Sequence, residues 1–482
     1  MKTKMKDIVV ILPGITGSYL AKDGKEIWGV SGSAVLRALR TLGDSLGDLE
    51  LNGDDPNLDM LDDQITATRI APATHLVPGL WKVVDGYSDL VRMLNNSFSL
   101  IEGNLDDEAP ANFYQFPYDW RRDNRVAARQ LKRLIDRQLP VWRDRSGHSD
   151  AKVILIGHSM GGLVSRYYTE VLDGWPHVKA LVTFGTPYRG SLNALDYLSN
   201  GYKKMFVDLT EVLRSCTSIY QLLPIYPLIS VGGGPDLCRV AEMEGLSQVD
   251  QARAIGALKF HREIEEALER NRKEPEYSVS VLPVVGVAQP TLQSATIDGR
   301  HLRVSKELPD GMDPSLSGGD GTVPRISSIP IEMSDQVFEV GFSQMHGSLQ
   351  ATDHALVVVR EWLKRLQLSS SLKPIRGPGD IIEDIHLPEV SVALEDVYSS
   401  KDNILITMSC CDRRSEKSVT SMRIRVSDCD TYEQVFDTTV DVSAEKVEVV
   451  LPELQEGQYE LRVAPQKSTV NNFVVRDVFC VD

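Results

Sequence analysis

The segment Lys152–Gly162, KVILIGHSMGG, joins a short apolar run to a glycine-rich turn. Its residues 153–156 are continuous and apolar with β-branched members, which is typical of a strand buried on both faces of a parallel sheet. The pattern G-x-S-x-G follows at once and places Ser159 on a sharp turn between a strand and a helix. Bulky side chains two positions before or after the serine would collide in such a turn, so glycines occupy both positions. The segment predicts a strand, a serine hydroxyl that projects from the sheet, and a helix that begins at Met160.

On both sides of this segment the chain alternates between buried strands and helices up to about residue 366. Apolar runs with strand character lie at residues 8–12, 113–120, 152–157, 178–185, 279–288 and 337–342. Helical spacing of apolar side chains marks residues 124–139 and 353–366. This order predicts an α/β fold with a mostly parallel central sheet. Together with the serine turn it favours an α/β-hydrolase catalytic domain over residues 1–366.

Two segments interrupt the alternation and are expected to lie over the edge where the strands end. The first, about residues 28–80, contains an amphipathic stretch followed by an acidic region, GDDPNLDMLDD at residues 53–63. The acidic region lacks the spacing of a calcium-binding loop. The second segment, about residues 191–272, has mainly helical spacing of apolar residues. We interpret the first as a lid and the second as a cap; the alternative is that both are further packed helices.

The character of the sequence changes after Gln367. Residues 367–387 are rich in serine, proline and glycine and are interpreted as a linker. Residues 388–482 contain strictly alternating apolar residues, for example at Met422, Ile424 and Val426. Short alternating strands of this kind predict a small β-sandwich of immunoglobulin-like type as an accessory domain.

The chain of 482 residues is long enough for two domains, and its overall charge limits its partners. The formal net charge of −16 repels phosphate backbones, so nucleic-acid binding is disfavoured, as is stable attachment to an anionic membrane. The sequence has no run of 18 apolar residues, and its start lacks the features of a signal peptide. The six cysteines are sparse and lack zinc-site spacing. These features predict a cytoplasmic protein without a metal or an organic cofactor.

A serine hydroxyl becomes a nucleophile only when a histidine accepts its proton and a carboxylate orients that histidine. In this fold the order along the chain is serine, acid, histidine. His346 follows the last expected strand and precedes the last helix of the domain, which is the place of the base. His354, at the start of that helix, is the alternative.

The acid is expected between the last two strands of the sheet. Asp320 lies there in a tight loop, GGDGTVP, whose glycines let a carboxylate approach another side chain closely. Asp310 and Asp313 are alternatives in a looser stretch nearby. The expected catalytic residues are therefore Ser159, Asp320 and His346.

Acyl transfer also needs donors for the negative charge that develops on the substrate oxygen. The backbone N–H of Met160, directly after the nucleophile, is one expected donor. The loop PGITGS at residues 13–18 supplies the second, which we assign to the N–H of Ile15. Three aromatic residues near these loops are expected to contact substrate or to line the pocket wall and core: Trp28, Tyr118 and Trp120.

Several motifs together resemble the lecithin:cholesterol acyltransferase family, which includes lysosomal phospholipase A2 and phospholipid:diacylglycerol acyltransferases. They occur in the family's order within residues 7–366 and read ILPGITGSYL, FYQFPYDWRRD, IGHSMGGLVSRYY, LVTFGTPYRGS, SIYQLLP and GGDGTVP. The resemblance implies a serine acyl-enzyme mechanism on lipid esters, with Ser159, Asp320 and a following histidine as triad. It also implies oxyanion positions at Ile15 and Met160 and a mobile lid after Trp28. The chain departs from the family because the lid has no cysteine pair and the β-sandwich lies outside the family's core.

These features predict a serine-dependent lipid acyl-ester hydrolase of lipase or phospholipase type, with water or an alcohol as the acyl acceptor. Its expected partner is a lipid or other ester substrate, reached through transient membrane contact. Two alternatives stay open. One is a soluble carboxylesterase, and the other is an idle lipase-like module that a protein partner activates through residues 388–482.

Overall fold

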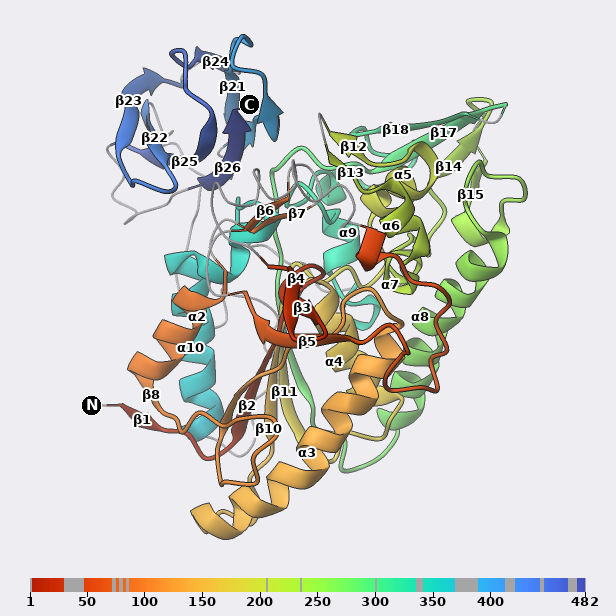
Figure 1. Ribbon diagram of the computed structural model, residues 1–482, viewed down its shortest axis with the longest axis vertical. Helices are drawn as coiled ribbons and strands as arrows, with labels where there is room; N and C mark the ends of the chain where they lie inside the picture. The colour runs from red at the N-terminus through yellow and green to blue at the C-terminus, as the bar shows by residue number, and fades with distance from the viewer. Residues whose placement is uncertain are drawn as a thin grey trace.

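The computed structural model describes most of the chain as a mixed α/β body with a β-sandwich packed against one end (Figure 1). The described residues are 2–29, 47–71, 75–77, 81–83, 86–204, 207–234, 236–299, 301–334, 341–368, 389–411, 421–442, 446–466 and 475–481. Among these residues, the structure contains no helix with the length and apolarity that crossing a membrane requires.

A five-stranded parallel sheet forms the centre of the larger body (Figure 1). Its strands lie in the order β16-β11-β10-β2-β9. They are β2 (Ile8–Leu12), β9 (Phe113–Gln115), β10 (Val153–His158), β11 (Val178–Phe184) and β16 (Ser280–Val284). Every residue of β2 and β10 is buried, as expected for strands that are covered on both faces. The predicted α/β fold with a parallel central sheet is confirmed.

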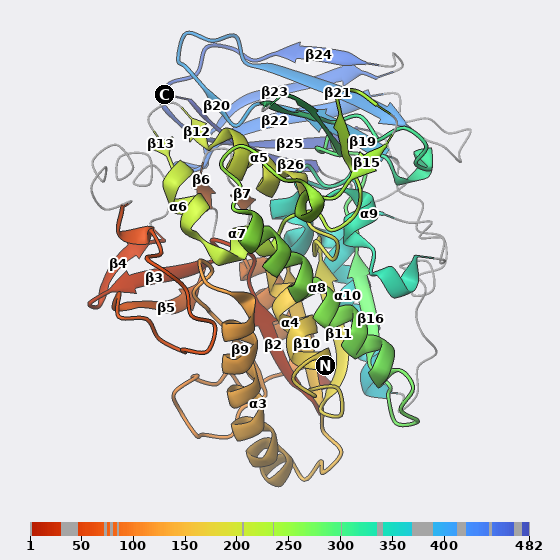
Figure 2. The same cartoon turned by 90° about the vertical axis from the view of Figure 1, so that its right-hand side faces the viewer.

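Helices cover both faces of this sheet, because successive strand residues point to opposite sides. One face packs against α3 (Asn124–Ser146), α4 (Met160–Glu170) and α8 (Gln251–Asn271). The other face packs against α2 (Ser88–Ser97) and α10 (Asp353–Leu368). Figure 2 shows α3, α4 and α8 running alongside the strands. Each buried aliphatic side chain in these two layers contributes about 1.5–3 kcal/mol.

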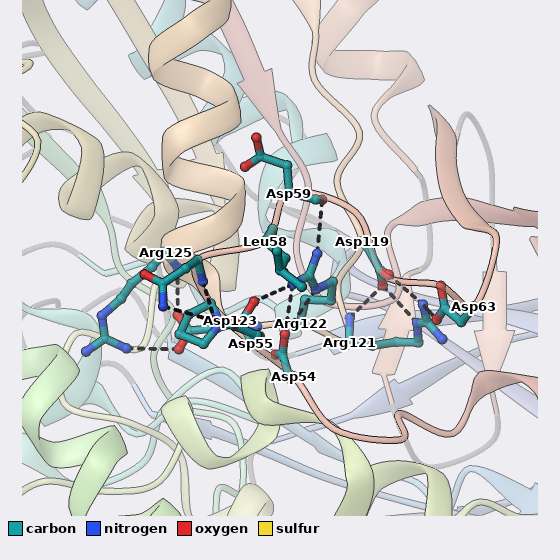
Figure 3. A network of polar contacts seen from close by, with 12 residues as sticks. Asp54, Asp55, Leu58, Asp59, Asp63, Asp119, Arg121, Arg122, Asp123 and Arg125 are labelled. Carbon is teal, nitrogen blue, oxygen red and sulfur yellow. Dashed lines mark hydrogen bonds and ion pairs between the residues drawn. The ribbon is translucent and has the colours of Figure 1, made fainter.

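The first insertion is built on a small antiparallel sheet in the order β4-β3-β5. Its strands are β3 (Ser18–Lys22), β4 (Lys25–Trp28) and β5 (Ile65–Ile70), and a short helix, η1 (Gly47–Leu49), lies between β4 and β5. The amphipathic stretch expected near residues 35–46 lies outside the described residues. The acidic region at residues 53–63 is described, and it runs beside the start of α3 (Figure 3).

The second insertion contains more β-structure than its helical spacing predicts. Its helices are α5 (Leu192–Asn200), α6 (Thr210–Ser215), α7 (Thr217–Gln221) and α8, and η2 (Val240–Glu242) precedes α8. Its strands β14 (Ile229–Val231) and β15 (Leu237–Cys238) join β17 (Ser294–Asp298) and β18 (His301–Ser305) in one sheet. The helical pattern did not reveal these strands: β14 pairs with β15 inside the insertion and with β17 beyond residue 272, and strands of two or three residues are too short to give a pattern of their own.

Short elements complete the larger body. They are the pairs β1 (Thr3–Lys4) with β8 (Phe98–Ser99), β6 (His75–Val77) with β7 (Trp81–Val83) and β12 (Lys203–Lys204) with β13 (Val207–Asp208). The short helices are η3 (Pro314–Leu316), α9 (Arg325–Ser328), η4 (Ile331–Met333) and η5 (His346–Ala351).

The C-terminal region forms two sheets that share one apolar core. One sheet has the order β19-β21-β24, with β19 (Glu389–Ala393), β21 (Leu405–Cys411) and β24 (Val447–Val450). The other has the order β20-β26-β25-β22-β23, with β20 (Val397–Tyr398), β22 (Ser421–Asp428), β23 (Gln434–Asp441), β25 (Gly457–Pro465) and β26 (Val475–Val481). Met422, Ile424 and Val426 all point into the core, which confirms the predicted alternation. The expected linker lies outside the described residues beyond Leu368.

The buried histidine of α8 gives the fold a dependence on pH. The Nε2–H of His261 donates to the carbonyl of Gln221 at 2.8 Å, and burial lowers the pKa of His261 from 6.5 to about 4. As the pH falls below 6.5, His261 is therefore protonated in the unfolded chain, whereas in the folded chain it is protonated only near pH 4. Stability is lost as pH falls through this window, by about 1.4 kcal/mol per pH unit for this group.

We expect the free energy of unfolding to fall less steeply with decreasing pH in His261→Gln, a variant that keeps a side-chain donor. Urea unfolding at pH 7.5, 6 and 5 measures it, with the exposed His301→Gln as a control that leaves the slope unchanged. Equal pH dependence in the wild type and His261→Gln would contradict the assignment.

Candidate active site

Ser159 lies in a strained turn between β10 and α4. Its backbone has φ 51° and ψ −125°, a conformation that residues other than glycine rarely adopt. A β-carbon added at Gly157 would lie 2.6 Å from the backbone nitrogen of Gly162. One added at Gly161 would lie 2.5 Å from the carbonyl oxygens of Leu12 and Pro13. Close backbone contacts are therefore the reason that both positions require glycine, as the sequence predicts.

Asp320 and His346 form a buried hydrogen-bonded pair. The Nδ1 of His346 lies 2.7 Å from Oδ2 of Asp320, and the two residues are 3% and 1% exposed. The other carboxylate oxygen accepts from the backbone N–H groups of Thr322 and Val323, at 3.0 and 2.7 Å. The backbone N–H of His346 donates to the carbonyl of Asp320 at 2.8 Å. Both oxygens and the loop that carries them are thus fixed, and the carboxylate holds the imidazole by one nitrogen.

The alternative residues lie elsewhere. His354 is in the first turn of α10, and Asp310 and Asp313 are exposed. The second ring nitrogen of His346, Nε2, is buried and has no hydrogen-bond partner among the described residues. That nitrogen is the atom a catalytic base uses to accept the serine proton. Of the strand expected at residues 337–342, only the end is described, where Phe342 pairs with Gly286.

His158 and Tyr87, which the sequence reasoning missed, connect the loops around Ser159. The backbone N–H of Gly14 donates to the Tyr87 hydroxyl at 2.8 Å, and that hydroxyl lies 3.0 Å from Nδ1 of His158. The Nε2 of His158 lies 3.1 Å from the carbonyl oxygen of His346. Burial, and then the neighbouring His346, lower the pKa of His158 to about 3, so the ring is neutral near pH 7. In the tautomer that satisfies all three bonds, Tyr87 donates to Nδ1 and Nε2–H donates to His346.

The expected oxyanion loop, residues 13–18, is held by the aromatic residues named from the sequence. The Tyr118 hydroxyl donates to the carbonyl of Pro13 at 2.8 Å, and the Trp28 indole donates to the carbonyl of Thr16 at 3.0 Å. Thr16 has φ 60°, which marks the turn that presents Ile15. Trp120 packs against Trp28 with ring centroids 5.2 Å apart. All three aromatic side chains are buried, so in this conformation they shape the loop from behind.

The turn that carries Ser159 and two of the three aromatic residues, Tyr118 and Trp120, belong to one segment. Residues 105–236 match the model of the lecithin:cholesterol acyltransferase family. The matched segment contains Ser159, Tyr118 and Trp120, so the resemblance seen in the motifs is confirmed over this part of the chain. No curated protein matches the sequence significantly.

Several solved structures are similar to this chain at low sequence identity. The Tle4–Tli4 complex contains a chain that is 16% identical, with 77% of this chain and 100% of that chain covered and a TM-score of 0.48. The Bacillus licheniformis lipase BlEst2 in propeptide form is 10% identical, with 98% and 92% covered and a TM-score of 0.30. Phospholipase PlaB from Legionella pneumophila is 10% identical, with 99% and 90% covered and a TM-score of 0.23.

Inside the segment that matches the acyltransferase family, two arginines bind the acidic region of the first insertion (Figure 3). Arg121 is fully buried and bonds to Asp119 at 2.6 Å and to Asp63 at 2.8 Å. Burial alone would lower the pKa of Arg121, but these two carboxylates raise it above its ordinary value. The guanidinium therefore stays charged. The acidic side chains at these positions serve as partners of arginine, a structural role for the region.

The side chain of Arg122 holds the same region mainly by binding backbone carbonyl groups of that region. Its guanidinium donates to the Asp54 carboxylate at 3.0 Å and to three carbonyl groups, those of Asp55, Leu58 and Asp59, at 2.9 to 3.0 Å. A lysine has no planar fork and cannot replace these four bonds together. The insertion is thus fastened at the start of α3, next to the supports of the oxyanion loop.

A cavity of about 680 Å³ lies between the larger body and the β-sandwich. Its lining includes Asp320 and His346 from the site, Tyr197 from α5, and Val392 and Tyr398 from the sandwich. Space beside the acid and the base is therefore bounded in part by the C-terminal region.

We expect Tyr118→Phe to lower kcat roughly 10-fold while KM changes little. The loss of the bond to Pro13 loosens the loop that carries the expected oxyanion donor, and one such donor is worth about 10²–10³ in kcat. The matched control is Tyr168→Phe, because the Tyr168 hydroxyl is buried without a partner among the described residues. Equal rates for the two variants in ester hydrolysis would contradict the role given to Tyr118.

We expect Arg122→Lys to speed amide hydrogen exchange in residues 54–63 roughly tenfold or more. A hydrogen bond to a charged group is worth about 1.5–3 kcal/mol, and this variant loses several. The exposed Arg92→Lys, whose ion pair with Asp89 lies in α2, is the control and leaves exchange in that region unchanged. Unaltered exchange in Arg122→Lys would show that other contacts hold the region.

Proposed function

We propose that the protein is a serine-dependent hydrolase of lipid acyl esters that works through an acyl-enzyme on Ser159. The observation that carries the proposal is the buried bond between Asp320 and His346, with the second imidazole nitrogen left without a partner among the described residues. A strained serine on a nucleophile turn accompanies it. A buried acid and base have this arrangement when the base must receive a proton in a fixed direction.

The proposed chemistry follows from these positions. The Oγ of Ser159 attacks the ester carbonyl while Nε2 of His346 takes the hydroxyl proton. The N–H groups of Ile15 and Met160 stabilise the negative charge on the former carbonyl oxygen, and the N-terminal end of α4 adds its positive potential. The alcohol leaves with the proton from His346, so the acyl group stays on Ser159. Water then attacks the acyl-enzyme, with His346 as base again, and releases the fatty acid and the free serine.

The family match supports a lipid ester as substrate and an ester hydrolase or acyltransferase as the class of enzyme. An alcohol that replaces water in the second step would give acyl transfer by the same atoms. In this proposal residues 1–366 form the catalytic domain, with a lid at about 28–80 and a cap at about 191–272. The lid meets the lipid surface in transient contact, because the net charge of −16 opposes stable attachment to anionic membranes.

The test is release of fatty acid from phosphatidylcholine vesicles by the wild type, Ser159→Ala and Asp320→Asn. We expect both variants to lose about 10⁴-fold or more in kcat, because the triad acts as a unit. The matched control is Ser165→Ala, a fully buried serine of α4 whose hydroxyl donates to the carbonyl of Gly161. A soluble short-chain p-nitrophenyl ester is assayed in parallel.

The outcomes separate the candidate functions. Activity on vesicles that is lost in Ser159→Ala supports a lipid acyl hydrolase. Activity on the soluble ester alone identifies a carboxylesterase. No activity on either ester, together with no labelling of Ser159 by a fluorophosphonate, would overturn the proposal.

A further inference from the structure

The β-sandwich is connected to the two loops that carry Asp320 and His346. It contacts the base loop, residues 345–348, directly, and it reaches the acid loop, residues 318–323, through Gln289. The hydrogen bonds of Gln289 are buried and that of Ser348 is partly buried, and all of them involve a region in which the sequence shows no catalytic motif.

The side chain of Gln289 completes the free edge of a sandwich strand. Among the described residues, strand β19 lies at the edge of its sheet and has β21 as its one neighbouring strand. On its other side, Nε2 of Gln289 donates to the carbonyl of Val390 at 2.9 Å, and Oε1 accepts from the N–H of Val392 at 3.1 Å. A side-chain amide offers the same donor and acceptor as a peptide group. The side chain of Gln289 therefore forms the two hydrogen bonds that a neighbouring strand would otherwise form with β19. Gln289 is 1% exposed.

The backbone of the same residue holds the acid loop. The N–H of Gln289 donates to the carbonyl of Gly319 at 3.0 Å, directly before Asp320. Its carbonyl accepts from the Thr291 hydroxyl at 2.9 Å, and that hydroxyl accepts from the N–H of Gly321 at 2.8 Å, directly after Asp320. Gln289 thus connects β19 to both neighbours of the expected catalytic acid.

The base loop is held by the sandwich in two further ways. Met345, the residue before His346, packs into the apolar core of the sandwich. The hydroxyl of Ser348, two residues after His346, donates to the carbonyl of Arg476 in β26 at 3.2 Å. Because His346 also bonds to Asp320 through its backbone and its ring, the acid and base loops are held as one unit with the sandwich.

We propose that the β-sandwich is a working part of the active site, and that Gln289 is the positioning residue through which it fixes Asp320 relative to His346. The inference rests on the proposed function, because it concerns the same acid and base. Gln289 touches neither reacting atom. It acts through the acid loop, where a misplacement of about 1 Å can cost about 10²-fold in rate.

The test compares Gln289→Leu, which keeps size and removes both side-chain bonds, with Gln138→Leu. Gln138 is also 1% exposed, but it lies in α3 and donates to the carbonyl of Asp107, remote from both loops. Steady-state kinetics of ester hydrolysis and urea unfolding are measured on the full chain. We expect kcat of Gln289→Leu to fall roughly 10- to 100-fold with KM within about threefold, while Gln138→Leu keeps its kcat.

A second variant protects the test against simple misfolding. Ser348→Ala removes only the bond to Arg476, and we expect its kcat to fall a few fold with KM unchanged. Its matched control is Ser165→Ala. Because Gln289 and Ser348 act through the same docked sandwich, the double variant should lose less than the product of the two single losses.

The failures of the two proposals can be told apart. If Ser159→Ala abolishes hydrolysis but Gln289→Leu and Ser348→Ala keep wild-type kcat, the proposed function stands and the positioning role is wrong. Equal loss of kcat in Gln289→Leu and Gln138→Leu overturns it too, since general destabilisation then explains both. If Gln289→Leu does not fold, a wild-type kcat in Ser348→Ala counts against the proposal and a reduced kcat supports it. A wild type that is inactive and unlabelled overturns the proposed function itself.

Discussion

The strained backbone of Ser159 is the constraint around which the rest of the structure is arranged. A conformation of this kind costs of order 1–3 kcal/mol and persists only where its surroundings leave no alternative. Here β10 lies between β2 and β11 at the centre of the sheet, and α4 begins directly after the serine. The N–H of Ser159 bonds to the carbonyl of Phe184 on β11, and its carbonyl accepts from the Thr186 hydroxyl. Glycines at the contact points let these backbones come close enough to hold the turn.

Hydrogen bonds offset the cost of burying Asp320 and His158 beside that turn. Both oxygens of Asp320 have donors, and the neutral ring of His158 has a partner at each nitrogen. Burial disfavours the charged form of His158, and the neighbouring His346 adds to this effect, which explains why the pKa of His158 is lowered to about 3. Nε2 of His346, in contrast, is buried and has no hydrogen-bond partner among the described residues, and in the proposed reaction it receives the serine proton. His158, with a partner at each ring nitrogen, therefore fits a structural role, and His346, with one nitrogen left without a partner, fits the proposed role of the base.

The sequence predicted those parts of the molecule that depend on local pattern. Continuous apolar strands, the G-x-S-x-G turn and the alternation in β22 are each readable within a few residues, and all were found. Asp320 and His346 were assigned from chain order, and the structure brings their side chains together. The pairing of β14 with β17, the roles of Tyr87 and Gln289, and the partnership of the acidic region with Arg121 and Arg122 were missed. These contacts join residues tens to more than a hundred positions apart, and nothing in a local pattern specifies such a partner.

The bond between Ser348 and Arg476 also orders events during synthesis of the chain. Arg476 lies in β26, so the base loop can obtain this contact only after that strand has left the ribosome. The sheet that contains β10 can form well before then, because all of its strands lie within residues 8–284. A nascent chain would thus contain the folded turn with Ser159 before the loops of Asp320 and His346 are held by the β-sandwich. In the proposed function, docking of the β-sandwich, rather than release of an inhibitor, would be the step that completes the active site.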